Sequence, residues 1–287
     1  MGKQGGESRN FSLRLPISEH TEIVKMIISK DGWKEVGFNL LSLFIAFSIW
    51  EIFTRYMNSP YFPGVGRIWG AFALLAKRGD VEGITLLQHI GASIIRILAG
   101  FGAATVMAIP LGLLMGLYPN IYKRTRAVLE PIRFIPPIAW IPVAIVLLVG
   151  FSRYAFLIWL GAFFPIFINT LVSVPRVNPI HVNVTRIFGA RRWYIIRKIV
   201  IPSVAPDMAS GMRIGLGIAW MCIVAAEMIG GEMMGVGRLI LKYAELIRMA
   251  EIIVGMLLIG LIGFLMNEVF LRVEKRLFRW RWEVSLD

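Results

Sequence analysis

The sequence has few charged side chains and few that could hold a metal. Only 17% of its 287 residues are charged and 57% are hydrophobic, whereas about a quarter of a soluble domain is charged. The single cysteine, Cys222, lies in an apolar run, which excludes a disulfide framework and a cysteine-rich metal site. The three histidines, His20, His89 and His181, show no ligand spacing. We therefore expect no metal site and assign the histidines structural or incidental roles.

The sequence also lacks the motifs of an enzyme. No lysine stands in the phosphate-binding pattern G-x-x-x-x-G-K-[ST], since Gly2 and Lys3 are followed by Gln4 and have no upstream glycine. The glycines of residues 100–102 lie inside an apolar run and follow no strand, so they are not a dinucleotide fingerprint. Neither a Ser/His/Asp set nor a pair of carboxylates can be proposed. We expect no catalytic residue and no cofactor on this chain. Any process driven by ATP would need the ATPase on another polypeptide.

Long apolar runs dominate what remains. Several reach about 20 residues, which at about 1.5 Å per residue cross the ~30 Å hydrocarbon core of a bilayer. The candidate spans are residues 37–57, 92–118, 127–151, 154–176, 210–230 and 251–272. They predict an all-α polytopic membrane protein with about six transmembrane helices. The chain then divides into a cytoplasmic N-terminal segment (1–36), a first transmembrane helix with an external segment (37–91), a transmembrane core (92–275) and a cytoplasmic tail (276–287).

The net charge of +13 follows from where lysine and arginine lie around these runs. With the N-terminus inside, the predicted cytoplasmic segments hold 20 of the 31 basic residues and the external segments hold seven. This bias fits the positive-inside rule, so binding of nucleic acid is not expected. The polar N-terminus lacks the apolar region of a cleaved signal peptide. We expect a multi-pass protein of the cell (inner, cytoplasmic) membrane with both termini cytoplasmic.

Four ionisable residues in or near the apolar runs are candidates for a transport pathway, because charge is costly in hydrocarbon. They are Arg96, Arg133, Arg213 and Glu227. Structural alternatives stay open for each. Arg133 and Arg213 lie near predicted inner ends and could snorkel to the interface, and Glu130 could simply pair with Arg133.

Prolines and glycines predict two features of helix packing. The third run contains "EPIRFIPPIAWIP", whose four prolines predict either a kinked packing helix or one that lines a pathway. The pairs Gly112-x-x-x-Gly116 and Gly211-x-x-x-Gly215 would allow close contact between helices.

The stretch "TRIFGARRWYIIRKIVIPSVAP" (185–206) brings four cations into eight residues of an otherwise apolar chain. On a helical wheel, most of its charged side chains after Gly189 lie opposite one apolar face, formed by Trp193, Ile195, Ile196, Ile199 and Val200. This pattern predicts an amphipathic cytoplasmic helix. Taken alone, it is typical of a surface helix that lies against lipid headgroups.

The spacing around those cations adds a family resemblance. Gly189, nine residues and then Ile199-x-Ile201-Pro202 resembles the cytoplasmic-loop signature of permease subunits of binding-protein-dependent (type I) ABC importers. The family pattern is Glu-Ala-Ala, three residues, Gly, nine residues, Ile-x-Leu-Pro. The spacing matches, but Asn183-Val184-Thr185 stands in place of Glu-Ala-Ala, and Ile201 replaces Leu. The resemblance extends over roughly 85–275 to the nitrate/sulfonate/taurine/bicarbonate branch, carried by residues 89–116, 133–151, 163–174 and 223–240.

The resemblance implies a permease with separate partners. Two copies (a homodimer), or this chain and a homologue, would form the pathway for a small anionic nutrient that an external binding protein delivers. Two ATPase subunits, which hold ATP and Mg, would dock at the cytoplasmic loop 176–206. A first helix over about 179–188 would enter a groove of the ATPase, and Gly189 would turn the chain into a second helix. The residues implied in coupling are Asn183, Val184, Thr185, Arg186, Gly189, Arg192, Ile199, Ile201 and Pro202.

Two other functions stay open on the residues alone. The chain could be a secondary transporter or channel that acts without partners, although no inverted repeat is detectable. It could also be a structural membrane subunit whose basic loop binds headgroups or a scaffold. Substrate identity is open as well, because the binding protein usually sets specificity in such importers.

Overall fold

The computed structural model describes residues 30–57 and 59–278, and within this part the regular elements are all helical. This confirms the predicted all-α fold class. Predictions for residues 1–29 and 279–287 lie outside the described residues. The chain divides into two compact units, residues 1–59 and 60–287, while the predicted four-part division stays a prediction.

The first unit contains one long described helix, α2 (Lys30–Met57). Its segment Gly37–Met57 is long and apolar enough to cross a membrane, in agreement with the span predicted over 37–57. In its last turns Arg55 Nε donates a hydrogen bond to Glu51 Oε1 at 2.9 Å.

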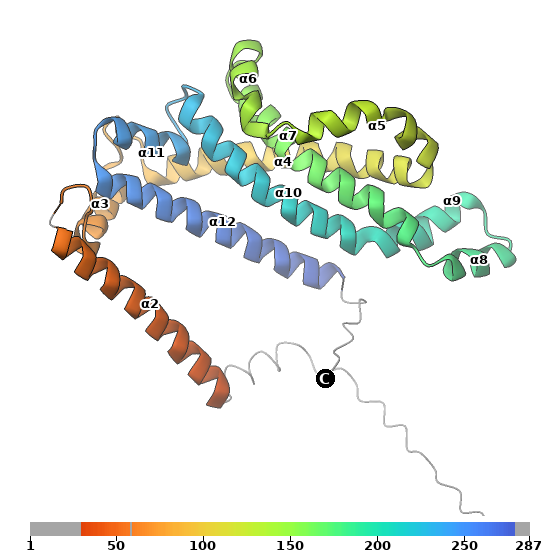
Figure 1. Cartoon of the computed structure of the whole chain (residues 1–287), viewed down its shortest axis with the longest axis horizontal. Helices are drawn as coiled ribbons and strands as arrows, with labels where there is room; N and C mark the ends of the chain where they lie inside the picture. Colours follow the sequence, from red (N-terminus) through yellow and green to blue (C-terminus); the bar gives the residue numbers. More distant parts are fainter. Residues whose placement is uncertain (1–29, 58, 279–287) are drawn as a thin grey trace, which may run out of the picture. The chain divides into compact units, whose positions relative to one another are not determined.

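The second unit is a bundle in which α7 is the central helix (Figure 1). Helix α7 packs against α4 on one side and α10 on the other, and α12 packs against α10 and α11. Most of the buried side chains of α7 are apolar, as expected for a helix that packs against several others. The elements are α3 Val65–Arg78, α4 Leu86–Leu117, α5 Pro119–Phe134, η1 Pro137–Trp140, α6 Ile141–Leu147, α7 Phe151–Ser173, η2 Val174–Arg176, α8 Pro179–Ile187, α9 Arg192–Ile195, η3 Ile196–Val200, α10 Ile201–Ile229, α11 Val236–Glu245 and α12 Met249–Leu277.

The number of helical segments that are long enough to span a membrane agrees with the prediction of about six. The described residues contain five helical segments long and apolar enough to cross, or six if a bent pair counts as one span. Four of them are longer than predicted, and two of these differ most at their first residue. Helix α4 begins at Leu86 because Thr85 and Gln88 form a capping box. The span predicted over 210–230 continues back through α9 to Arg192, so that one helical segment covers Arg192–Ile229.

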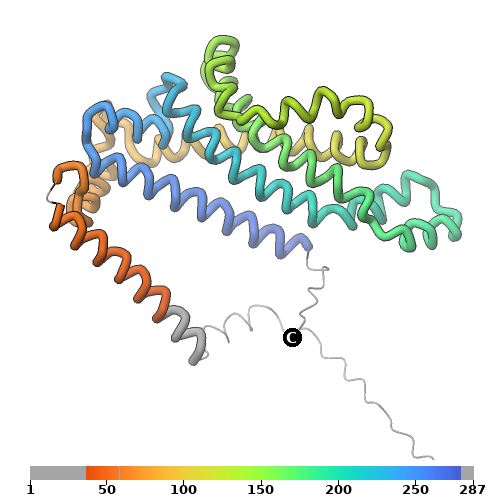
Figure 2. The backbone as a smooth tube through the Cα atoms, viewed as in Figure 1, coloured from red at the N-terminus to blue at the C-terminus, as the bar shows by residue number. Residues whose placement is uncertain are grey.

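The third predicted span is the main correction. Residues 127–151 do not form one kinked helix: α5 ends at Phe134, and the chain resumes as η1 and α6, with an 88° bend between the two halves. Figure 2 shows the tube turning sharply between the yellow-green α5 and the green segment of η1 and α6 that follows it. Two adjacent prolines, Pro136 and Pro137, stand at the bend. Neither can donate a backbone hydrogen bond, and their rings clash with the preceding turn.

The glycine pairs lie at close helix contacts, as predicted. A Cβ added at Gly112 would lie 2.7 Å from Thr170 Cβ on α7, and one at Gly116 would lie 2.7 Å from Val174 Cβ. On α10, a Cβ at Gly211 would lie 2.6 Å from Asn169 Cβ. Real Cβ contacts are not this short, so α4 and α10 can approach α7 only because these positions carry no side chain.

Candidate functional site

The loop between α7 and α10 is built as two helices joined by a glycine turn. Asn178 caps α8 by accepting a hydrogen bond from the Ile180 N–H at 2.9 Å, and Pro179 occupies the first turn. Helix α8 ends at Ile187, close to the predicted end near 188. Gly189 follows with φ +78°, a conformation that glycine adopts without strain. The predicted turn at Gly189 is therefore present.

The polar residues predicted for coupling are arranged around one hollow. Asn183 and Arg186 on α8 and Arg192 on α9 line a cavity of about 650 Å³ between the two helices and the end of α4. The Arg192 guanidinium lies 4.8 Å from the centre of the Tyr118 ring. Thr185 Oγ1 donates back to the His181 carbonyl at 2.6 Å, and Val184 is exposed. Three of the predicted residues thus share one surface, and their role in coupling stays a prediction.

The C-terminal residues of the signature anchor the loop to the bundle. Ile199 and Ile201 pack against a buried cluster formed by Val174, Ile195, Val200, Val204 and Met208. Pro202 lies just after the π-helical segment η3, inside a continuous helical segment, where it cannot donate the usual backbone hydrogen bond. Because α9, η3 and α10 follow without a break, a displacement of the loop would act directly on a membrane-spanning helix.

An exposed apolar tip was not predicted from the sequence. Ile187 and Phe188, just before Gly189, are 82% and 85% exposed. Trp193, which was predicted to lie on the apolar face of the second helix, is 69% exposed. The sequence signal for the exposed tip was the presence of two large apolar residues, Ile187 and Phe188, at the end of a short helix.

The predicted pathway residues Arg96 and Glu227 pair with each other inside the bundle. Arg96 Nη1 on α4 lies 2.8 Å from Glu227 Oε1 on α10 and also donates to the Met234 carbonyl at 2.7 Å. Glu227 has no exposed surface, and it accepts hydrogen bonds from Ser93 Oγ and the Gly237 N–H. The pair therefore holds α4, α10 and the turn before α11 together.

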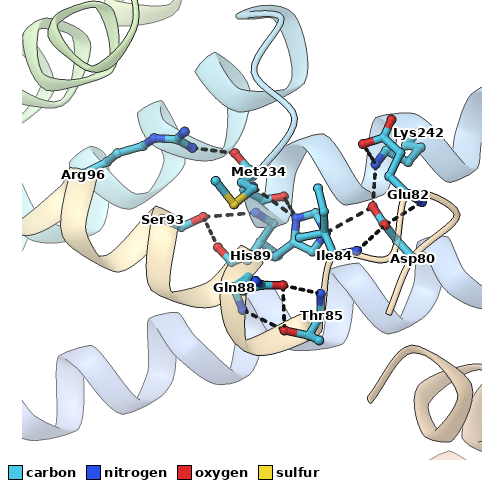
Figure 3. Close-up of polar contacts among 12 residues, drawn as sticks. Asp80, Glu82, Ile84, Thr85, Gln88, His89, Ser93, Arg96, Met234 and Lys242 are labelled. Carbon is cyan, nitrogen blue, oxygen red and sulfur yellow. Dashed lines mark hydrogen bonds and ion pairs between the residues drawn. The ribbon is translucent and has the colours of Figure 1, made fainter. Parts of the chain in front are cut away.

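A second buried set continues this network along α4 (Figure 3). His89 Nε2 lies 3.3 Å from Asp80 Oδ2, and His89 Nδ1 accepts from the Gly235 N–H at 3.1 Å. Lys242 on α11 donates to Asp80 and to Glu82. Sequence reasoning missed Asp80 and Lys242, which are 162 residues apart.

The charges of Asp80 and Lys242 support each other. Burial acts to raise the pKa of the Asp80 carboxyl, but hydrogen bonds from Lys242 and from the Ile84 and Glu82 N–H groups lower it below its ordinary value. Burial acts to lower the pKa of the Lys242 ammonium, but the hydrogen bonds to Asp80 and Glu82 raise it above the ordinary value. Both groups are therefore ionised at neutral pH, as a buried salt bridge requires.

The remaining two arginines form ion pairs of their own. Arg133 Nη2 lies 3.0 Å from Glu130 Oε2, the pairing considered as an alternative from the sequence. Arg213 Nη1 lies 3.7 Å from Glu274 Oε2 on α12. Among the described residues no three His, Cys, Asp or Glu side chains gather as a metal site would need. The absence of a cofactor on this chain stays a prediction.

With this geometry the comparisons identify the class of protein. Residues 108–279 match the sequence profile of the family described as the inner membrane component of binding-protein-dependent transport systems. The chain belongs to that family, and it is a multi-pass permease subunit of the ABC importer type.

Similar proteins place it in one branch of the family. A protein of Methanocaldococcus jannaschii, named as an ABC transporter permease, is 36% identical over 260 residues, 90% of this chain and 97% of its own. The taurine transport system permease TauC of Escherichia coli is 29% identical over 255 residues, 88% and 92% of the two chains. The nitrate import permease NrtB of Synechocystis sp. is 35% identical over 187 residues, 65% and 68%. The chain is thus a member of the nitrate/sulfonate/taurine/bicarbonate branch.

A solved structure shares the fold at low sequence identity. The chain matches a structure of the inward-facing MetNI methionine ABC transporter with a TM-score of 0.59 and 17% identity, covering 67% of this chain and 95% of that one. The match supports the type I importer fold. A transporter or channel of another family, and a purely structural subunit, are not supported by these findings.

Proposed function

We propose that this chain forms one half of the pathway of an ATP-driven importer for a small anion, and that loop 176–206 couples it to separate ATPase subunits. The observation that carries the proposal is the loop itself. Its two helices meet at Gly189 and present an exposed apolar tip, Ile187 and Phe188, beside the basic hollow of Arg186 and Arg192. A partner that fills such a surface would need a groove with an apolar floor and acidic rim.

The loop suits the transmission of movement. Helix α8 is short and held by its cap, and the segment Arg192–Ile229 is one helical rod that reaches across the bundle. Movement of the ATPase subunits during ATP hydrolysis would shift the loop and bias α10 between two packing states. Asn183 cannot supply the carboxylate that the family motif has at its position. We therefore assign the main share of the contact energy to the apolar tip.

The substrate class follows from the relatives. Their names refer to taurine and nitrate, and both molecules carry a small oxyanion group. We propose such a group as the common feature of the substrate here. The rest of the assembly in this proposal is an external binding protein, a second copy of the chain, ATP and Mg on the ATPase, and both termini on the cytoplasmic side.

The coupling role can be tested at the tip. Phe188→Ser and Ile187→Ser remove apolar surface without touching the bundle. We expect each to lower the amount of ATPase subunit that co-purifies with the permease by about tenfold or more, since central apolar anchors dominate such contacts. ATP-driven uptake into proteoliposomes should fall with it.

A matched control is Val149→Ser, which changes an equally exposed apolar residue (84%) in the turn between α6 and α7. It should retain the ATPase subunits fully. If the Phe188 and Ile187 variants retain the ATPase and transport like the unmodified protein, the proposed coupling surface is wrong.

A further inference from the structure

The bend between α5 and α6 borders an open cavity at the surface of the bundle, where the lining residues Phe134 and Ile214 are exposed. The cavity holds about 490 Å³, which is within the size range of small-molecule sites. Its walls include Gly161 and Pro165, close to the midpoint of α7, and Ile214, close to the midpoint of α10. The cavity therefore lies at mid-depth between helices that span the membrane. Discontinuous helices at this depth are where many transporters bind their substrates.

The lining combines apolar walls with two polar side chains. Phe164, Ile168, Ile214 and Ile218 are apolar, and Arg133 supplies a cation. On α7, Asn169 donates one amide hydrogen bond to the Pro165 carbonyl at 2.8 Å. Its other amide hydrogen and its oxygen have no hydrogen bond within the described residues. In an apolar setting, these few polar groups decide which solutes are stabilised.

The donors of Arg133 are only partly used. Its Nη2 pairs with Glu130 at 3.0 Å, and its guanidinium carbon lies 4.8 Å from the Phe134 ring centre. Its Nε is buried and has no hydrogen-bond partner among the described residues. A buried donor without a partner is costly, and more so on a charged group. The Arg133 side chain is nevertheless 32% exposed, so an oxyanion in the cavity would meet the accessible part of the guanidinium and not the buried Nε.

Glu130 keeps such a site weak. It is held by Tyr122, whose hydroxyl donates to Glu130 Oε1 at 2.6 Å, and it neutralises much of the Arg133 charge. An anion would then meet a cation that is attractive but already partly compensated. A transport pathway needs this balance, because a solute must enter its site and also leave it.

We propose that the cavity at the α5–α6 bend is a transit site for a small oxyanion, which Arg133 and Asn169 bind. This inference rests on the proposed import of an anion and names the residues that would select for it. Cations of similar size would be repelled there, and neutral solutes would gain little. The guanidinium is suited to this role because its planar donors match nitrate, bicarbonate or sulfonate oxygens.

The test measures the electrostatics of the cavity with charged thiol reagents. In a Cys222→Ala background, Asn169→Cys is the reporter, with Ile214→Cys as a second reporter on the facing helix. The assembled transporter, in right-side-out and inside-out membrane vesicles, is treated with an anionic ethylsulfonate or a cationic trimethylammonium methanethiosulfonate. The readout is a ratio of two rates at which the reporter cysteine is modified, that of the anionic reagent over that of the cationic reagent. Each rate is first divided by the rate at which the same reagent modifies a free thiol in solution.

We expect a ratio well above one that depends on charge at Arg133. Arg133→Gln should lower it about tenfold, and Arg133→Lys should keep it within about threefold. Glu130→Gln should raise it, and the double variant Glu130→Gln/Arg133→Gln should return it to near one. The matched control Arg272→Gln, which breaks an exposed pair on α12 outside the cavity lining, should leave it unchanged. A merely structural Arg133 would not give this order.

Two results would overturn the proposal. One is a ratio that Arg133→Gln and Glu130→Gln leave unchanged. The other is a reporter that neither reagent reaches from either side at position 169 or 214. The measurement needs neither ATP nor a binding protein, so its failure leaves the coupling function standing. Conversely, a result that contradicts the proposed coupling surface would not change the ratio of the two modification rates.

Discussion

Arg96 Nη1 and Glu227 Oε1 lie 2.8 Å apart in the interior of the bundle, and the Glu227 side chain is completely buried. The carboxylate is also a hydrogen-bond acceptor for Ser93 and for the Gly237 N–H. Because charge is stable in such a place only when it is paired and hydrogen-bonded, the pair fixes how the ends of α4 and α10 meet the start of α11.

Removal of one partner should therefore destabilise the fold strongly. Glu227→Ala leaves the Arg96 cation buried without a counter-charge, which costs about 3–5 kcal/mol in comparable sites. The expected result is a large drop in the melting temperature of the purified transporter. The control is Glu268→Ala, which breaks an exposed pair with Arg272 (2.9 Å) and should cost at most about 1 kcal/mol. Equal melting temperatures for the two variants would contradict the structural role of the pair.

The turn that faces this pair should be equally sensitive to a single methyl group. Gly235 has φ +142°, and a Cβ there would lie 2.6 Å from Glu227 Oε2. Gly235→Ala should disrupt the network and lower the yield of folded protein. Gly231 also has positive φ (+78°), but nothing lies within 4 Å of an added Cβ. Gly231→Ala should cost only backbone strain, about 1–3 kcal/mol. Thermal melting compares the two variants: the melting temperature should fall further for Gly235→Ala, because the collision with Glu227 adds to the strain.

Local features of the fold could be predicted from the sequence because their causes are local. Helix α8 and the turn at Gly189 were implied by the family resemblance, and the structure shows their local causes, a capped proline start and a glycine with positive φ. The close contacts of Gly112 and Gly211 follow from small residues at helical spacing. The early start of α4 was also within reach, because Thr85 and Gln88 have the spacing of a capping box.

Features that join distant segments could not be predicted in the same way. The sequence marked Arg96 and Glu227 as costly in a membrane, but their pairing depends on how α4 and α10 pack. Likewise, the prolines of the third run predicted a break, but the 88° bend depends on what α5 and α6 contact afterwards. The partners of Asp80 lie in α4 and α11, and no local pattern connects them.

The Asp80–Lys242 pair predicts a stability difference that depends on pH. The pKa of folded Asp80 lies below its ordinary value of 3.8, so its contribution to stability is complete above that pH and is lost as pH falls through the folded pKa. Asp80→Asn should therefore melt well below the unmodified protein at pH 7, and the difference should shrink below about pH 4. Melting curves of both proteins from pH 3 to pH 8 check this, and a difference that stays constant would show that the ion pair does not contribute.

The last prediction concerns the backbone of the coupling loop. Gly189 has φ +78° and open space around an added Cβ, so a substitution there acts through backbone strain and not through collision. Asn tolerates positive φ better than Ala, and β-branched Val tolerates it least. Of the three variants, Gly189→Asn should therefore keep the most ATP-driven uptake, Gly189→Ala less and Gly189→Val the least. A strain of about 1.4 kcal/mol corresponds to about a tenfold loss of the uptake rate.

The matched control for this series is Gly102→Ala in α4. It also has open space around the added Cβ but shows no positive φ, and alanine favours a helix over glycine by about 1 kcal/mol. Uptake by the Gly102 variant should equal that of the unmodified protein. If Gly189→Val transports as well as Gly102→Ala, then the turn at Gly189 does not transmit movement from the ATPase, and the lever must lie elsewhere in loop 176–206.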